Sequence, residues 1–128
     1  MRTNQTNTSR LWTGRVISAL CVLFLLFDGV IHILNIAPVV QAFAKLGYSD
    51  RLAAPLGVLE LICVVLYVIP RTSVFGAILL TGYLGGATAS NLRIGDPFLF
   101  SVFIGVLVWT GLALQHDRLR SVLANGPA

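Results

Sequence analysis

Four apolar segments, each near the length needed to cross a membrane, constrain the fold of this chain more than any other feature. A helix rises about 1.5 Å per residue, so a hydrocarbon core about 30 Å thick requires roughly 20 apolar residues. Charged residues make up 11% of the chain, whereas a typical soluble domain has about 25%. We therefore expect an all-α integral membrane protein with spans at about residues 15–36, 53–70, 73–92 and 97–115.

The segments that connect these spans are short. Pro70 cannot continue the second helix, and Arg71 can reach lipid headgroups, so a tight turn is predicted there. Consecutive spans joined by short turns are antiparallel neighbours. The sequence thus predicts a four-helix up-down bundle over residues 15–116, flanked by a flexible polar tail at 1–14 and a second tail at 117–128.

The connector between the first two spans, PVVQAFAKLGYSD, has a helical pattern of its own. Pro38 suits the first turn of a helix, Val39, Phe43 and Leu46 fall at helical spacing, and Gly47 can end it. We expect a short amphipathic helix at the outer interface of the membrane. A simple connector without a helix is the alternative.

Lysine and arginine residues set the expected orientation, because basic residues are enriched in cytoplasmic loops. Six lie on the side of the predicted bundle that holds both termini, and three lie on the other side. Both termini are therefore predicted to be cytoplasmic. Because setting the topology is the ordinary role of basic residues at span ends, no nucleic-acid partner is expected; the bilayer is the expected partner. The two sets are Arg2, Arg10, Arg15, Arg71, Arg118 and Arg120, and Lys45, Arg51 and Arg93.

Polar side chains inside the predicted spans mark a candidate site. Asp28 and His32 are four residues apart and share one helix face, and Glu60 lies inside the second span. With Arg15 and Arg71 at the inner surface, the helical rise places Asp28 roughly 20 Å and Glu60 roughly 16 Å above it. We expect a polar ligand pocket in the outer half of the bundle, formed by Asp28, His32, Glu60, Thr88 and Asn91 and closed by Arg93.

Two interpretations of these polar residues stay open. A charge at the centre of a span costs about 2.5 to 3.5 kcal/mol, so the acids should be paired, protonated or hydrated. They could form a structural cluster that holds helices together, or a ligand or proton site. A metal site is not expected: two carboxylates and a histidine can bind iron or manganese, but the Glu-x-x-His spacing of helical sites is absent.

Small and sulfur-containing residues raise two further questions. Gly82 and Gly86 are four apart in the third span, which predicts close packing inside the bundle, with a homo-oligomer interface as the alternative. Cys21 and Cys63 are at similar depths on the polar faces of their spans, so they could meet. Since no C-x-x-C motif is present, they are interpreted first as small buried apolar residues.

The stretches FDGVIHILN, LGVLEL, IPR and GGATASNLRIGDP resemble the DoxX-like family of small membrane proteins, over about residues 23–119. The resemblance implies a four-helix bundle in the bacterial cytoplasmic (inner) membrane. The family's namesake is a membrane subunit of a thiosulfate:quinone oxidoreductase. Such sequences commonly have lysine at the position of His32 and histidine at the position of Asn91, so both positions depart from the pattern.

Three functions are consistent with these observations, and the sequence does not decide whether the chain is an enzyme. The first is a redox-associated subunit whose pocket holds a quinone or another small molecule. Because no haem, flavin or iron–sulfur ligation pattern is visible, its electrons would come from a membrane oxidoreductase partner. The second is a carrier or channel for a small solute. The third is a structural accessory subunit of another membrane protein.

Overall fold

The computed structural model describes residues 2–126, with side chains from residue 7 onward, and the described residues form helices and no strand. The all-α prediction is confirmed. The elements are α1 (Arg2–Leu34), α2 (Ala37–Leu46), the 3-10 turn η1 (Asp50–Leu52), α3 (Ala53–Val68), α4 (Ser73–Arg93), α5 (Leu99–Gln115) and α6 (Asp117–Asn125).

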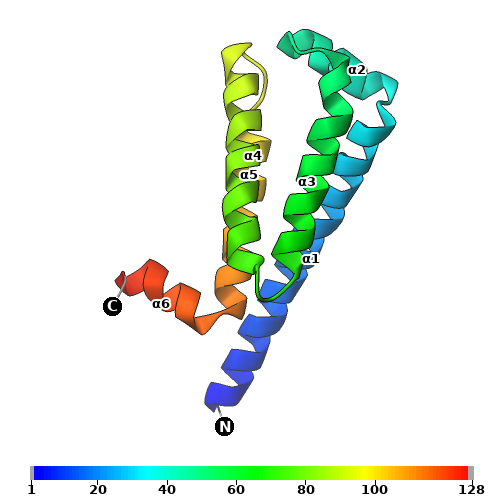
Figure 1. Cartoon of the computed structure of the whole chain (residues 1–128). Coiled ribbons are helices and arrows are strands. Elements are labelled where there is room, and N and C mark those ends of the chain that lie inside the picture. The colour runs from blue at the N-terminus through cyan, green and yellow to red at the C-terminus, as the bar shows by residue number, and fades with distance from the viewer. Residues whose placement is uncertain (1, 127–128) are drawn as a thin grey trace.

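The four long helices α1, α3, α4 and α5 pack side by side (Figure 1). α1 contacts α3 and α5, and α4 also contacts α3 and α5, so the four helices enclose a common interior. α2 lies across one end of this assembly, and α6 leaves the other end at 115° to α5 (Figure 1). We call these ends the α2 end and the α6 end; the predicted topology places the α2 end outside.

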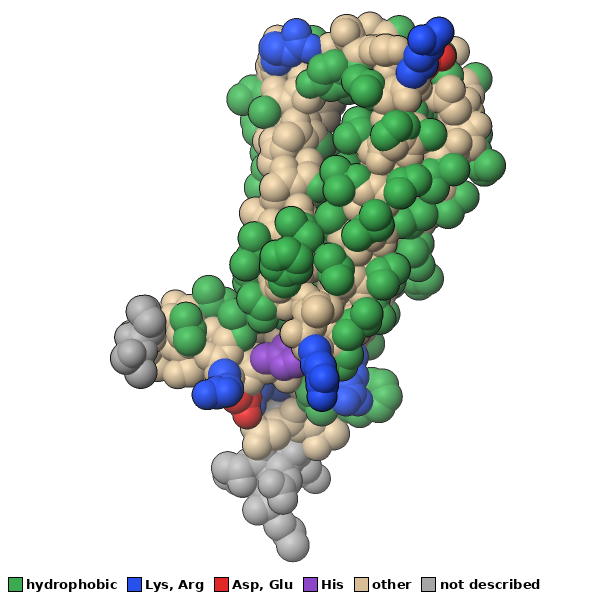
Figure 2. Space-filling view, viewed as in Figure 1, with side chains coloured by type: hydrophobic (Ala, Val, Ile, Leu, Met, Phe, Trp, Pro, Cys, Tyr) green, Lys and Arg blue, Asp and Glu red, His purple; other side chains and the backbone are tan. Residues whose placement is uncertain are grey.

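Helix length and surface chemistry identify the chain as a multi-pass membrane protein. Within the described residues, three helices are long and apolar enough to span a membrane, and a fourth qualifies when α5 and α6 are counted as one bent span. Hydrophobic side chains cover the sides of the long helices, whereas lysine and arginine gather at the two ends (Figure 2). This distribution suits a lipid-facing middle between two polar interfaces.

Both predicted tails contain helix. α1 continues to Arg2 instead of starting near residue 15, because no proline or glycine interrupts residues 2–13. α6 occupies most of the segment expected to be a C-terminal tail; Asp117 sits in its first turn, where a negative charge is favourable, and bonds Arg120 at 2.5 Å. Arg10 and Asp117 then link α1 to α6 at 3.5 Å. Met1 and residues 127–128 lie outside the described residues.

The connector helix is present as predicted. Pro38 lies in the first turn of α2, and Gly47, with φ of +80°, ends it in the left-handed conformation that glycine adopts readily. Val39 and Phe43 are buried against Ala53 at the start of α3, in a small apolar cluster separate from the main core. α2 is thereby fixed on top of α3.

The close helix contacts use other glycines than those expected. A Cβ added at Gly57 of α3 would lie 2.6 Å from the carbonyl oxygen of Gly29 on α1, and one at Gly14 would lie 2.9 Å from that of Gly111 on α5. A Cβ at Gly82 or Gly86 would meet nothing within 4 Å. The predicted packing through Gly82 and Gly86 is therefore wrong, because α3 and α4 diverge toward the α2 end (Figure 1).

The main core occupies the middle and the α6 end of the helix assembly. Cys21 and Cys63 are both buried in it as free thiols. Other members include Leu25, Leu80 and Val108, which contribute from α1, α4 and α5. The dense packing stops short of the α2 end, where the divergence of α3 and α4 leaves room for a cavity.

Candidate functional site

A cavity of about 750 Å³ lies beneath α2, between α1, α3, α4 and α5. We call it the α2-end cavity. Its walls are mainly leucine, phenylalanine and other apolar side chains. Asp28, His32, Glu60, Tyr83 and Asn91 supply polar groups to the lining.

Glu60 is the most confined of these polar residues. It projects from α3, and none of its surface is exposed. The Tyr83 hydroxyl on α4 donates a hydrogen bond to Oε2 at 3.1 Å, whereas Oε1 has no hydrogen-bond partner. An unsatisfied buried polar group costs about 1 to 3 kcal/mol. A ligand that donates a hydrogen bond to Glu60 Oε1 would therefore gain binding free energy.

Asp28 and His32 occupy adjacent turns of α1, next to Glu60. His32 Nδ1 lies 2.6 Å from the backbone carbonyl oxygen of Asp28 and 3.4 Å from its carboxylate Oδ2. A nitrogen this close to a carbonyl oxygen carries a proton and donates it. Asp28 and His32 are thus paired with each other within α1. This pairing does not involve Glu60 Oε1.

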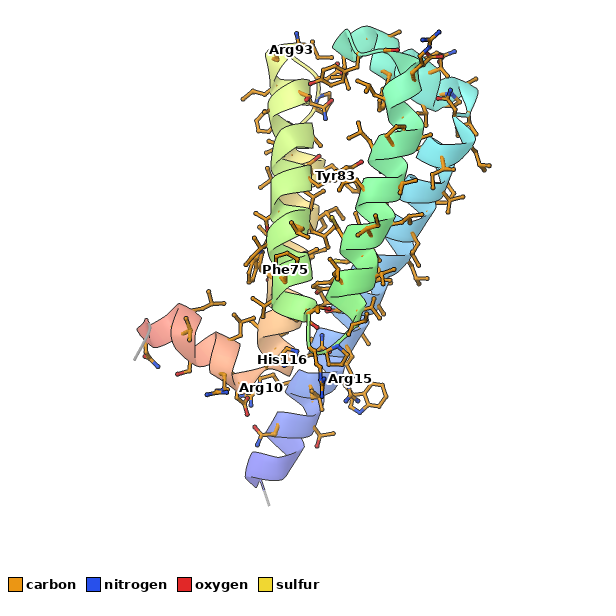
Figure 3. All side chains as sticks on the ribbon, in the orientation of Figure 1. Arg10, Arg15, Phe75, Tyr83, Arg93 and His116 are labelled. Atoms are coloured by element: carbon orange, nitrogen blue, oxygen red, sulfur yellow. The ribbon has the colours of Figure 1, made fainter. Side chains whose placement is uncertain are left out.

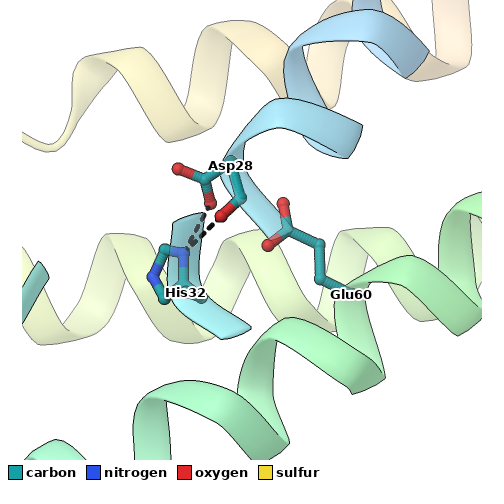
Figure 4. Close-up of side chains that lie close together, drawn as sticks. All are labelled: Asp28, His32 and Glu60. Atoms are coloured by element: carbon teal, nitrogen blue, oxygen red, sulfur yellow. Dashed lines mark hydrogen bonds and ion pairs between the residues drawn. The ribbon is translucent and has the colours of Figure 1, made fainter. Parts of the chain in front are cut away.

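The folded chain brings Asp28, His32 and Glu60 together as one polar cluster (Figure 4). One oxygen or nitrogen from each residue lies within 4.8 Å of the others. The residues come from two helices, so helical spacing within α1 groups only Asp28 with His32, and the predicted depth of Glu60 adds the third residue. Gly29 and Gly57 make the cluster possible, because their close approach brings α1 and α3 together at this level.

The cluster has ligand types that bind metals, but its present geometry suits hydrogen bonding better. The His32 nitrogen that faces the carboxylates already donates to the Asp28 carbonyl. The other ring nitrogen points away from Glu60 (Figure 4). A metal ion bound by all three side chains would require the ring to give up that hydrogen bond or turn over.

Of the other three predicted site residues, only Asn91 lines the cavity, whereas Thr88 and Arg93 do not. The Thr88 hydroxyl donates to the Leu84 carbonyl of its own helix at 2.8 Å. Arg93 lies at the α2 end (Figure 3), where it donates to the Leu46 carbonyl and its guanidinium carbon is 5.9 Å from the centre of the Tyr48 ring. Arg93 therefore holds α2 rather than lining the pocket.

Two further contacts tie α2 and the turn after it to α4 and to the loop that follows α4. Lys45 Nζ pairs with Asp96 Oδ1 at 2.6 Å, and the hydroxyls of Tyr48 and Ser90 are 2.8 Å apart. Together with the Arg93 bond they bridge the space between α2 and α4. α2 consequently covers the end of the cavity.

The cavity is open at the side, between α3 and α4. Leu59 of α3 and Ile78 of α4 both line it, yet about half of each side chain is exposed, 47% and 53% respectively. Gly82 and Gly86, which also line it, add no side chain to the opening. Figure 2 shows a hollow there in the surface, and Tyr83 points across the gap toward α3 in Figure 3. In a membrane this opening would face lipid.

Tyr83, the residue that bonds Glu60, was missed by the sequence reasoning. The available signal was its hydroxyl, because a tyrosine within an apolar span needs a hydrogen-bond partner.

Comparison with known protein families identifies the family of this chain. The profile of the DoxX-like family matches residues 16–111, three quarters of the chain. The chain belongs to the DoxX-like family. The match to this DoxX-like chain covers Asp28, His32 and Glu60 as well as most of the four long helices. No significant match is found among curated proteins or among solved structures.

Proposed function

We propose that this DoxX-like protein binds a lipid-soluble small molecule in the α2-end cavity, with the polar head of that molecule at Glu60. The unpartnered, fully buried Oε1 of Glu60 carries the proposal. A cavity of about 750 Å³ falls in the usual range of ligand sites, roughly 300 to 1,000 Å³. Its apolar walls with a few convergent polar groups also follow the common pattern of such sites.

The proposed membrane arrangement is an up-down bundle of α1, α3, α4 and α5 in the bacterial cytoplasmic membrane, with both termini inside. α5 has 17 residues, none of them charged, which is close to the shortest length that spans a bilayer, about 17 residues. The distribution of basic residues supports the orientation. The polar cluster then lies in the outer half of the membrane, and the side opening faces the acyl chains.

A quinone is the ligand class that we favour. Its apolar tail would fit through the side opening between α3 and α4, and its head would reach the polar cluster. Reduction of a quinone to a quinol takes up two electrons and two protons. Glu60 can accept or donate a proton at Oε1, while Tyr83 holds Oε2 in place. His32 can exchange protons through its ring nitrogens.

The role of the protein is then that of a redox-associated subunit, with electrons from a membrane oxidoreductase partner. One observation also favours an accessory role. Gly85 lies on an exposed face of α4, where a Cβ would meet nothing within 4 Å. Small residues of this kind allow a helix of another protein to approach closely.

A titration with a short-chain quinone tests the binding proposal. The purified protein in lipid nanodiscs would be titrated with decylubiquinol, the reduced form, whose hydroxyl groups can donate to Glu60 Oε1, with the bound fraction read by native mass spectrometry. Glu60→Gln replaces one carboxyl oxygen with an amide at nearly constant shape and should weaken binding about tenfold, near the value for one lost charge-assisted hydrogen bond. Asp50→Asn, at the start of η1, is the matched control, because Asp50 is exposed and does not line the cavity. Equal affinity for the wild type and Glu60→Gln would refute the placement of the head group.

A further inference from the structure

A second cavity, of about 530 Å³, lies at the α6 end between α1, α3 and α5. We call it the α6-end cavity. Arg15 from α1 and His116 from the junction of α5 and α6 line it, and both lie at this end in Figure 3. Val22, Val68 and Leu112 are among its apolar lining residues, and no aspartate or glutamate is among the residues that line it.

The cationic lining of this cavity has no counter-charge within the described chain. The Arg15 guanidinium forms no ion pair there; its closest characterised contact is with the Trp12 ring, at 5.5 Å from the centroid. Asp117 is the acid at this end, and it already pairs with Arg120 at 2.5 Å and with Arg10 at 3.5 Å. Arginine stays protonated at any physiological pH. A permanent positive charge is therefore left beside the cavity.

The other polar groups around the cavity satisfy one another. The Gln115 amide is 3.2 Å from the Gly14 carbonyl, 2.9 Å from Ser18 Oγ and 2.9 Å from the Gly111 carbonyl. The Tyr67 hydroxyl lies 2.9 Å from Ser18 Oγ and donates to the Val108 carbonyl at 2.7 Å. These bonds fix the end of α5 against α1.

The same bonds decide which side chains a ligand would meet. His116 directly follows Gln115, so the anchored end of α5 holds its imidazole at the cavity that Arg15 also lines. Among the described residues, neither the Arg15 guanidinium nor the His116 imidazole has a hydrogen-bond partner. The groups that remain for a ligand are thus two nitrogen-bearing side chains that can donate.

The level of the cavity in the membrane identifies the class of ligand. Trp12 is 58% exposed one turn before Arg15, and tryptophan and arginine at the ends of spans mark the headgroup region. A ligand at this level that offers negative charge to Arg15 and apolar surface to Val22 and Val68 is an anionic phospholipid. Basic pockets between membrane helices on the cytoplasmic side bind such headgroups.

We propose that the α6-end cavity binds the phosphate group of an anionic phospholipid through Arg15 and His116. Arg15 bonds the two free phosphate oxygens with its planar guanidinium, and His116 donates to one of the same two oxygens. The lipid's glycerol and upper acyl chain lie against the apolar wall. A zwitterionic lipid would bring an ammonium group, and no carboxylate lines the cavity to pair with it. This site is independent of the ligand proposed for the α2-end cavity.

Competition between lipids tests the site. The full chain in mild detergent would be exposed to equal amounts of phosphatidylglycerol and phosphatidylcholine, and bound lipid would be read by native mass spectrometry. We expect phosphatidylglycerol to be preferred, and Arg15→Gln to reduce that preference at least about fivefold, the equivalent of one surface lysine or arginine near anionic lipid. His116→Ala should reduce it less, because it removes a donor but no permanent charge.

Arg71→Gln is the matched control, since Arg71 is exposed at the same end but does not line the cavity. It should leave the preference unchanged. Arg15→Lys keeps the charge, so it should retain most of the preference even if Arg15→Gln folds poorly. Equal binding of both lipids by the wild type, or an equal loss in Arg71→Gln and Arg15→Gln, would overturn the proposal.

Inorganic phosphate separates the lipid from a free ion. In delipidated protein reloaded with phosphatidylglycerol, phosphate at millimolar concentration should fail to displace the lipid, because phosphate gains nothing from the apolar wall. Displacement of the lipid by phosphate in the wild type would show a site for the phosphate ion and would contradict the lipid proposal.

Discussion

Adding one methyl group at Gly57 should loosen the contact between α1 and α3 that assembles the polar cluster. A Cβ at this position would lie 2.6 Å from the Gly29 carbonyl oxygen and 2.9 Å from the Cβ of His32. Neither atom is the end of a flexible side chain, so one helix must move. Overpacking of this kind costs about 1 to 3 kcal/mol. We therefore expect Gly57→Ala to lower the free energy of unfolding by that amount.

Gly85→Ala provides the matched control, because a Cβ there would meet nothing within 4 Å. The change from glycine to alanine in an exposed helix position is favourable by up to about 1 kcal/mol. Gly85→Ala should therefore be neutral or stabilising, although it makes the same chemical change in a neighbouring helix.

The protein contains its own reporter for this comparison. Cys21 and Cys63 are free thiols with 1% and 2% of their surface exposed. A maleimide dye that fluoresces on reaction with thiols would report their exposure as detergent-solubilised protein is heated. Gly57→Ala should react at a lower temperature than the wild type, and Gly85→Ala should not. Equal transition temperatures for the two variants would refute the close approach of α1 and α3 at Gly29 and Gly57.

Three further predictions concern the α2-end cavity and its cover. Gly86→Leu should place a side chain in the cavity and abolish decylubiquinol binding while the thermal transition stays within a few degrees of the wild type; unchanged binding would place the ligand elsewhere. Tyr83→Phe should remove the hydrogen bond that the Tyr83 hydroxyl donates to Glu60. It should lower the free energy of unfolding, read from the thiol-exposure assay, by about 1 to 3 kcal/mol, the cost of an unsatisfied buried polar group. Lys45→Ala should lower the free energy of unfolding by less than about 1 kcal/mol, because exposed ion pairs contribute little. It should nevertheless speed hydrogen exchange in α2. An unchanged exchange rate would show that the pair with Asp96 does not hold α2 in place.

Much of the polar site could be predicted from helical periodicity and depth. Asp28 and His32 are four residues apart, so their shared face follows from the helix alone. The depth of Glu60 follows from counting residues from Arg71. Their proximity needed only antiparallel neighbours, although the 4.8 Å grouping also depends on Gly29 and Gly57.

Contacts between elements could not be predicted in the same way. Thr88 and Arg93 are at the correct level, but their side chains bond the Leu84 and Leu46 carbonyls. The spacing of Gly82 and Gly86 shows a smooth helix face, but it does not show whether a neighbour lies against that face. The divergence of α3 from α4, which opens this face to the cavity, is a property of the packed assembly.

The helices in the two terminal segments also could not be predicted from local sequence. Polar composition at residues 1–14 is compatible with a flexible segment or with a solvated helix. The contact of Arg10 with Asp117 joins residues more than a hundred positions apart. No local pattern in the sequence could reveal that pairing.

Native mass spectrometry of the protein gently extracted from its own membrane tests the central claim most directly. Glu60→Ala and Gly86→Leu would be measured in parallel, with Asp50→Asn as control. The account predicts a small lipid-soluble molecule bound to the wild type and to Asp50→Asn, and lost from the two cavity variants. A wild type without such a molecule, or one whose bound molecules persist in both cavity variants, would contradict a ligand site at Glu60.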